Sequence, residues 1–201
     1  MSSEILDLDG WKEELAEYSQ ASFWRGLISG TGGNLSLRIP GTDQVLVTPS
    51  GISLAEVEPE NVIMVDLEGA VVEAPKGLVP SKETGFHLEG YRARDQVLAV
   101  AHLHPPYATA FANKRMELPM CTVSARGNLR HVPWIKTAIP GSPELRENVA
   151  RALAEDPGDR AFLMEEHGTL VLAQDLKTAF YLTDLLEDTA KIAYFEMNIR
   201  G

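Results

Sequence analysis

The chain is poor in cysteine and in long apolar runs, and each shortage excludes a class of protein. A single cysteine, Cys121, has no partner for an internal disulfide, which fits a reducing compartment. No apolar run approaches the roughly 18 residues that a membrane-spanning helix needs. The amino terminus, residues 1–4, lacks the basic start and apolar centre of a signal peptide. These features predict a cytoplasmic protein that does not enter a membrane.

Basic residues are also scarce. The chain has 18 Lys and Arg against 29 Asp and Glu, a net charge of −11, so neither nucleic acid nor an anionic membrane is an expected partner. A phosphorylated metabolite would be repelled too, unless a metal ion, backbone amides or a placed lysine held it locally. With 201 residues, 44% of them hydrophobic, the chain is long enough for one domain with a sizeable core.

The strongest chemical signal is an apolar run, residues 97–101, that leads into His102, Leu103 and His104 before two prolines. This pattern predicts a buried strand that stops at a site. Residues two apart on a strand face the same way, so the two imidazoles lie side by side, about 7 Å apart along the strand. Such a pair suits Zn²⁺. The alternative is that both histidines cap the strand and bind nearby backbone.

A third histidine stands at a polar kink between two apolar strand halves in residues 161–173. His167 lies there, after two glutamates and before Gly168. Three neutral imidazoles around Zn²⁺ would leave open positions for a substrate. Mn²⁺ and Co²⁺ also accept imidazole, so the sequence does not select the metal. His87 is expected to pack or to support the site, and His131 to be a loop residue.

Two loops of small residues, 30–34 and 48–51, can together form a nest of backbone amides for an anion, although either can also be a plain tight turn. The first leads into a strand, which excludes a dinucleotide fingerprint and a P-loop. Ser81 is the expected N-cap of a helix over residues 82–94. Glu83 would then lie in the first turn, where the helix terminus favours a carboxylate and a docked phosphate.

Periodicity and capping signals predict the remaining elements. Residues 35, 37 and 39 are apolar and alternate with polar ones, which predicts a half-buried strand over 35–39. Ser142 and Asp175 are the expected caps of the last two helices. The expected helices are 7–29, 82–94, 107–113, 143–155 and 176–198, and the expected strands, besides those already named, are 44–48, 62–66, 70–73, 120–123 and 134–138.

Five motifs in order carry a resemblance to a known family: Gly32-Gly33-Asn34-Leu35-Ser36, Thr48-Pro49-Ser50-Gly51, Pro80-Ser81-Lys82-Glu83, His102-Leu103-His104 and Glu166-His167-Gly168. Together they resemble the class II aldolase and adducin-head family, which includes L-fuculose-1-phosphate aldolase. The resemblance covers almost the whole chain and implies one such domain over residues 1–201. It also implies an α/β fold, a three-layer α/β/α sandwich around a mainly antiparallel sheet, and a homotetramer with sites at subunit interfaces.

The resemblance further implies a role for each motif. His102, His104 and His167 would hold Zn²⁺, and Glu83 would be the catalytic acid/base. The phosphate of a small sugar or keto acid would lie against Asn34, Ser50, Gly51 and Ser81. The implied activity is a lyase that breaks a carbon–carbon bond of a phosphorylated keto-sugar by a retro-aldol reaction, through a metal-stabilised enediolate.

Two departures from the aldolase pattern keep a second activity open. Lys82 stands where the aldolase has a second serine, and Ser81-Lys82-Glu83 resembles the branch that decarboxylates 3-oxo-tetronate 4-phosphates. Lys82 could pair with a carboxylate or phosphate of the substrate, or point to solvent. The chain ends at Gly201, so the tail that lends a tyrosine to a neighbouring site in the aldolase is expected to be absent.

Two further activities are disfavoured. The 4-epimerase branch relies on an aspartate after the His-x-His segment, and none lies between Asp95 and Asp156. A non-catalytic, adducin-like interaction module would have no reason to keep three metal ligands and an acid.

Overall fold

The computed structural model describes residues 8–199, which fold around one sheet of eight strands in the order β4-β3-β2-β1-β5-β8-β7-β6. Neighbouring strands are antiparallel except for the parallel pair β6 and β7. The strands are β1 (Asn34–Arg38), β2 (Gln44–Val47), β3 (Ile63–Asp66), β4 (Val71–Glu73), β5 (Ala99–Leu103), β6 (Trp134–Ile135), β7 (Ala161–Met164) and β8 (Gly168–Ala173). The expected mainly antiparallel sheet is confirmed.

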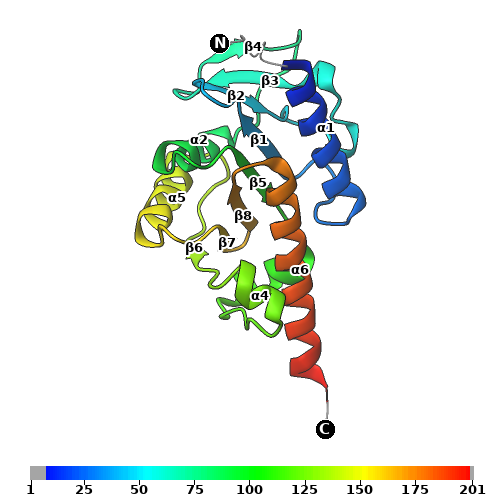
Figure 1. Cartoon of the computed structure of the whole chain (residues 1–201), viewed down its shortest axis with the longest axis vertical. Helices are drawn as coiled ribbons and strands as arrows, with labels where there is room; N and C mark the ends of the chain where they lie inside the picture. The colour runs from blue at the N-terminus through cyan, green and yellow to red at the C-terminus, as the bar shows by residue number, and fades with distance from the viewer. Residues whose placement is uncertain (1–7, 200–201) are drawn as a thin grey trace, which may run out of the picture.

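Helices cover both faces of this sheet (Figure 1). One face packs against α1 (Leu8–Trp24), α3 (Pro106–Lys114), α4 (Val123–Asn128) and α6 (Leu176–Asn198), and the other against α2 (Thr84–Ala93) and α5 (Pro143–Glu155). Two short 3₁₀ helices, Leu54–Glu56 and Pro59–Asn61, lie between β2 and β3. The result is the expected α/β/α sandwich in a single domain. Within residues 8–199, no helix combines the length and apolar character needed to span a membrane.

Each central strand contributes to two cores because its side chains alternate between faces. Leu35, Leu37 and Ala101 belong to the core under α1 and α6, whereas Val100 belongs to the core under α2 and α5. The expected strand over residues 35–39 is confirmed as β1, but it is not half-buried: Ser36 is fully buried, because α2 covers its face of the sheet. We call the two sides of the sheet the α6 face and the α2 face.

Two helices start or end elsewhere than expected. The first helix ends at Trp24, not at residue 29, and a turn follows in which Gly26 has φ +78° and Leu27 N donates to Ser22 O. Its expected start at residue 7 lies outside the described residues. Ser81 is not the N-cap of α2, since Glu83 occupies that position. The Thr84 amide instead donates to Ser81 O, so residues 82–83 form a turn before the helix.

The remaining corrections concern short segments. The expected strand over 120–123 is wrong because Thr122 caps α4, its hydroxyl accepting from Ala125 N at 3.0 Å. The expected strand over 134–138 is reduced to the two residues of β6. Residues 161–173 form a hairpin of two antiparallel strands, not one kinked strand, with Glu166 at φ +55° in its turn. Ser142 and Asp175 cap α5 and α6 as predicted.

Candidate active site

His102 lies near the end of β5, in the middle of the sheet. Asn34 of β1 is its partner on one side and Leu170 of β8 on the other. The ring is fully buried, and its Nδ1 lies 2.9 Å from the carbonyl oxygen of Thr169. A carbonyl can only accept, so Nδ1 carries the hydrogen in the neutral ring. The lone pair on Nε2 is then free to bind a cation.

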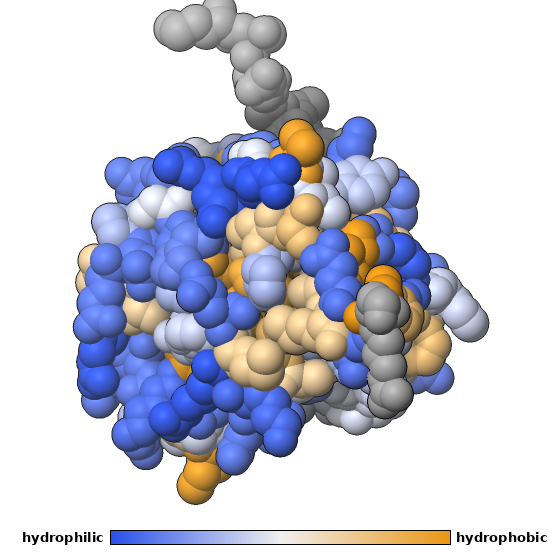
Figure 2. All heavy atoms as spheres, turned by 90° about the horizontal axis from the view of Figure 1, so that it is seen from below, coloured by the Kyte–Doolittle hydropathy of each residue, from blue (hydrophilic) through white to orange (hydrophobic). Residues whose placement is uncertain are grey.

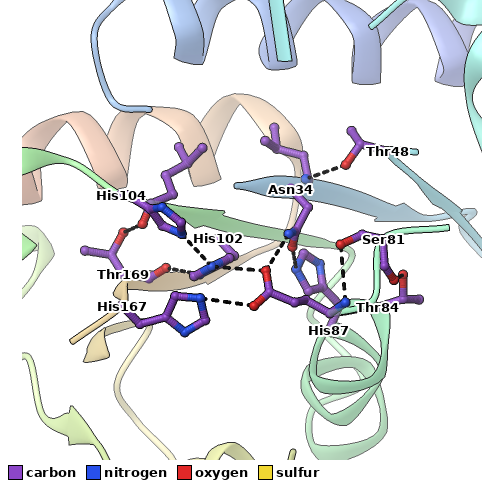
Figure 3. Close-up of polar contacts among 12 residues, drawn as sticks. Asn34, Thr48, Ser81, Thr84, His87, His102, His104, His167 and Thr169 are labelled. Carbon is purple, nitrogen blue, oxygen red and sulfur yellow. Dashed lines mark hydrogen bonds and ion pairs between the residues drawn. The ribbon is translucent and has the colours of Figure 1, made fainter. Parts of the chain in front are cut away.

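The other two imidazoles converge on the same point (Figure 3). His104 follows β5, and its Nε2 lies 3.0 Å from Nε2 of His102. His167 comes from the turn of the β7–β8 hairpin, with ring centroids 4.6 Å from His102 and 5.3 Å from His104. One ring nitrogen of each lies within 4.8 Å of the others. The three histidines predicted from the sequence are therefore brought together.

Gly168 allows this convergence because the hairpin lies directly against the end of β5. A Cβ atom at this position would be 2.3 Å from the carbonyl oxygen of Leu103 and 2.6 Å from Cδ2 of His104. Both distances are shorter than any real Cβ contact, and one is to backbone. Any larger residue would push His167 away from the other two imidazoles.

Glu83 places a carboxylate beside the three rings. Its Oε2 accepts a hydrogen bond of 2.9 Å from Asn34 Nδ2 and lies 3.4 Å from His102 Nε2. Its Oε1 lies 3.0 Å from His167 Nε2, but among the described residues no aligned donor reaches it, although it is buried. A buried carboxylate and three imidazoles, with one ring nitrogen of each within 4.8 Å of the others, form a set of groups that a cation can bind together. The donor set thus fits a divalent metal ion.

Burial and neighbouring groups set the charge of these side chains. Burial would raise the pKa of Glu83, but the contact with His167, the nearby His102 and the Asn34 amide outweigh it and lower that pKa below its ordinary value. Burial lowers the pKa of His102, and burial together with His167 lowers that of His104 to about 4. At neutral pH the site combines a carboxylate with neutral His102 and His104, the forms that bind a metal.

A cleft of about 250 Å³ opens above this cluster. The four residues predicted to contact phosphate line it, as do Lys82, the predicted acid/base and two of the three histidines, whereas His102 lies buried beneath. The structure thus gathers the predicted site in one place, while the roles of its residues stay predictions. The lining residues are Thr31, Gly32, Gly33, Asn34, Pro49, Ser50, Gly51, Ser81, Lys82, Glu83, His104, Pro140 and His167.

Backbone pairing joins the loop over residues 48–51 to residues 79–81 on the phosphate side of the cleft. Pro49 and Pro80 form an isolated antiparallel bridge, and Ser81 N donates to Thr48 O at 3.3 Å. Ser50 N donates to Val79 O at 2.9 Å. The Ser50 amide is therefore used within the protein, so an anion would meet its hydroxyl instead.

Sequence reasoning missed how the site is supported. Pro140, from the loop before α5, lines the cleft without having been predicted. His87, expected to pack or to support the site, hydrogen-bonds through Nε2 to Oδ1 of Asn34 at 2.6 Å. The sequence held one signal for this role: His87 is four residues from Glu83, which places both on the same side of a helix. His131, expected in a loop, does lie in one and pairs with Asp159 at 2.8 Å.

Comparison with known proteins gives consistent matches. Residues 13–194 match the family described as Class II Aldolase and Adducin N-terminal domain. A 5-deoxy-D-ribulose 1-phosphate aldolase of Bacillus thuringiensis is 32% identical, covering 91% of this chain and 84% of that protein. A 3-oxo-tetronate 4-phosphate decarboxylase of Haemophilus influenzae is 34% identical, covering 91% and 86%. A solved L-fuculose 1-phosphate aldolase superposes with a TM-score of 0.86 at 34% identity, covering 98% and 89%.

Proposed function

The chain belongs to the class II aldolase and adducin N-terminal domain family, and from that premise we propose that it is a metal-dependent lyase acting on a phosphorylated keto-sugar. The reaction is a retro-aldol cleavage of a carbon–carbon bond. The observation that carries the proposal is the convergence of three imidazoles and the Glu83 carboxylate at the base of one cleft. We take the whole of residues 1–201 as one domain of this family.

We propose Zn²⁺ as the metal, with Mn²⁺ or Co²⁺ as substitutes, held by His102, His104 and His167. The bound ion would act as a Lewis acid, stabilising the negative charge that develops on the substrate oxygen as the carbon–carbon bond breaks. Neutral imidazoles support this choice because they leave the charge of the ion undiminished.

Glu83 is the proposed acid/base. Its Oε2 is held by Asn34, so Oε1 is the oxygen available to a substrate. As a base, Oε1 takes the proton of the hydroxyl on the departing fragment, and the O–H electron pair forms the carbonyl of the released aldehyde. The electron pair of the broken bond stays on the other fragment, whose carbon then regains a proton from Glu83. With a ketose 1-phosphate the products are an aldehyde and dihydroxyacetone phosphate.

The joined loops are the proposed phosphate site. The Ser50 and Ser81 hydroxyls, Gly51, and the second amide hydrogen of Asn34 are the donors. Lys82 is exposed beside them and supplies a positive charge, which the net charge of −11 makes necessary. Gly51 has φ +77°, a conformation that favours glycine and exposes backbone at the cleft.

Decarboxylation of a 3-oxo-tetronate 4-phosphate is the second candidate. It is favoured by Lys82 in the Ser81-Lys82-Glu83 motif and by the 34% identity to the decarboxylase of Haemophilus influenzae. Both reactions leave an electron pair beside a carbonyl, so the histidines serve either. Lys82 could hold the carboxylate of such a substrate.

We further propose that the enzyme works in the cytoplasm as a homotetramer with its sites at subunit interfaces. Apolar side chains support an interface, because they gather on the face that contains α4 and the end of α6 (Figure 2). The exposed residues there include Val123, Tyr194, Met197 and Ile199. Light scattering of the purified protein tests the assembly, and a monomer at micromolar concentration would contradict it.

A substrate panel tests the activity. The zinc-loaded protein is incubated with L-fuculose 1-phosphate, 5-deoxy-D-ribulose 1-phosphate and 3-oxo-tetronate 4-phosphates, and both aldehyde and CO₂ are measured. We expect an aldehyde and dihydroxyacetone phosphate, and their loss in Glu83→Gln. Release of CO₂ without aldehyde would make the decarboxylase the correct assignment, and no cleavage of any substrate would contradict both.

A further inference from the structure

A continuous chain of buried polar side chains runs from the interior of the domain to the candidate acid/base. It links Tyr91, Ser36, His87, Asn34 and Glu83, and every one of them is at least 95% buried. The four contacts measure 2.6 Å from Tyr91 Oη to Ser36 Oγ, 2.7 Å from Ser36 Oγ to His87 Nδ1, 2.6 Å from His87 Nε2 to Asn34 Oδ1, and 2.9 Å from Asn34 Nδ2 to Glu83 Oε2.

The chain arises from two matching periods. Glu83, His87 and Tyr91 are four residues apart, which puts them on one side of α2. Asn34 and Ser36 are two apart on β1, which puts both on the α2 face. The helix and the strand therefore interleave their polar side chains, and Figure 3 shows His87 beneath Asn34.

The donor and acceptor of every hydrogen bond in this chain follow from the charge of Glu83. An ionised Glu83 can only accept, so Asn34 donates through Nδ2 and presents Oδ1 to His87. His87 must then donate through Nε2–H. Burial lowers the pKa of His87 to about 4, so the ring is neutral and its Nδ1 accepts from Ser36. Because the Ser36 hydrogen is used, Tyr91 donates to Ser36.

We propose that His87 is a positioning residue, which, through a hydrogen-bond relay anchored by Ser36 and Tyr91, holds the Asn34 amide with its NH₂ group toward Glu83. An asparagine amide can turn by 180° at little steric cost. The reversed amide would place Oδ1 against the carboxylate. The relay excludes that state and keeps Oε2 occupied, so that Oε1 is the oxygen left without an aligned donor among the described residues. This role rests on the proposed function of Glu83.

The relay predicts a graded loss of kcat along its length. His87→Leu leaves Asn34 Oδ1 without a donor and should lower kcat about 10- to 100-fold, with a change in KM of no more than about threefold. His87→Gln keeps an N–H donor and should recover about tenfold of that loss. Ser36→Ala and Tyr91→Phe, which remove one hydroxyl each, should lower kcat by about two- to tenfold. Ser22→Ala is the matched control, since Ser22 is buried on α1 and donates to Tyr18 O.

A second readout does not depend on activity. Nitrogen-15 NMR of the metal-free protein at pH 7 should show His87 as the neutral Nε2–H form, and Tyr91→Phe should perturb its Nδ1 resonance. A charged His87 or an Nδ1–H form overturns the relay even if the enzyme cleaves its substrate. Equal kcat in His87→Leu, His87→Gln and wild type, each folded and with full metal content, also overturns it. If no substrate is cleaved, the proposed function fails while the NMR result still decides the relay.

Discussion

The two faces of the central strands differ in what they bury. On the α6 face, β1 and β5 present Leu35, Leu37 and Ala101 to an apolar core. On the α2 face, the same strands present Asn34, Ser36 and His102. Two polar side chains from α2 and its N-cap, His87 and Glu83, hydrogen-bond to Ser36 and Asn34. Because β1 and β5 carry side chains on both faces, the apolar packing on the α6 face fixes where the polar side chains of the α2 face lie. One face should therefore govern stability and the other chemistry.

The largest effect should come from removing one imidazole on the α2 face. In His167→Ala, two ring nitrogens remain, and we expect bound metal to be lost and activity to fall by at least about 1000-fold. Elemental analysis and steady-state rates measure both. His131→Ala, which removes an exposed loop histidine, is the control and should keep metal and rate. Full metal content in the His167 variant would show that the third ligand is wrongly assigned.

A side-chain truncation on the α6 face should lower stability and leave the reaction rate almost unchanged. Leu37 is 2% exposed, and Leu37→Ala should lower the free energy of unfolding by about 2–5 kcal/mol. The kcat of the folded fraction should stay within about twofold of wild type, because no polar partner is lost. Urea titration gives the first quantity and rates below the transition the second. Val71→Ala, on the exposed edge strand β4, is the control at about 0.5 kcal/mol or less. A large fall in kcat of folded Leu37→Ala would contradict the division.

An intermediate effect concerns pH, and it should arise on the α2 face. The pKa of His87 is about 4 in the folded state and 6.5 ordinarily, so below pH 6.5 the unfolded chain binds the extra proton first. Stability from this group is complete above pH 6.5 and falls toward pH 4, with a slope approaching about 1.4 kcal/mol per pH unit.

The measurement is urea unfolding of metal-free wild type and His87→Gln at pH 7, 6 and 5. The difference between the two proteins should shrink as the pH falls, because only the wild type loses this stabilisation. A constant difference would show that His87 titrates alike in both states.

The smallest effect should come from a buried hydroxyl on the α6 face. Thr183 is fully buried, and its Oγ1 donates only within α6, to Ala179 O at 2.9 Å. Thr183→Val keeps the shape, so we expect a stability change within about 1 kcal/mol and no change in rate. Thermal unfolding and steady-state assays measure it. A loss of kcat equal to that of Ser36→Ala would remove the contrast between the two faces.

Periodicity sufficed for the strands and helices that fill the cores. The apolar run into His102 and the caps Ser142 and Asp175 were predicted correctly because each signal is local. The segment over residues 120–123 was mistaken for a strand because a short apolar run looks the same in a strand and at the start of a helix. Its start signal was Thr122, which caps α4.

The site was predictable in its residues but not in its connections. Motif order predicted the three histidines and Glu83, which the structure brings together, whereas the link from His87 to Asn34 depends on how α2 packs across β1. That packing depends in turn on the start of α2 at Thr84, two residues after the expected start at 82. Element boundaries are the least certain part of any sequence-based prediction. Gly168 likewise entered the prediction only as the glycine beside His167 and as part of a motif, although its missing side chain is what lets the hairpin reach β5.

The most direct test of the central claim is anomalous diffraction at the zinc absorption edge from crystals of the purified protein. We predict one peak per chain, bounded by ring nitrogens of His102, His104 and His167 and adjacent to the Glu83 carboxylate. Crystals grown with zinc that show these imidazoles bonded only to protein groups, with no peak among them, would contradict the metal centre and the lyase proposed from it.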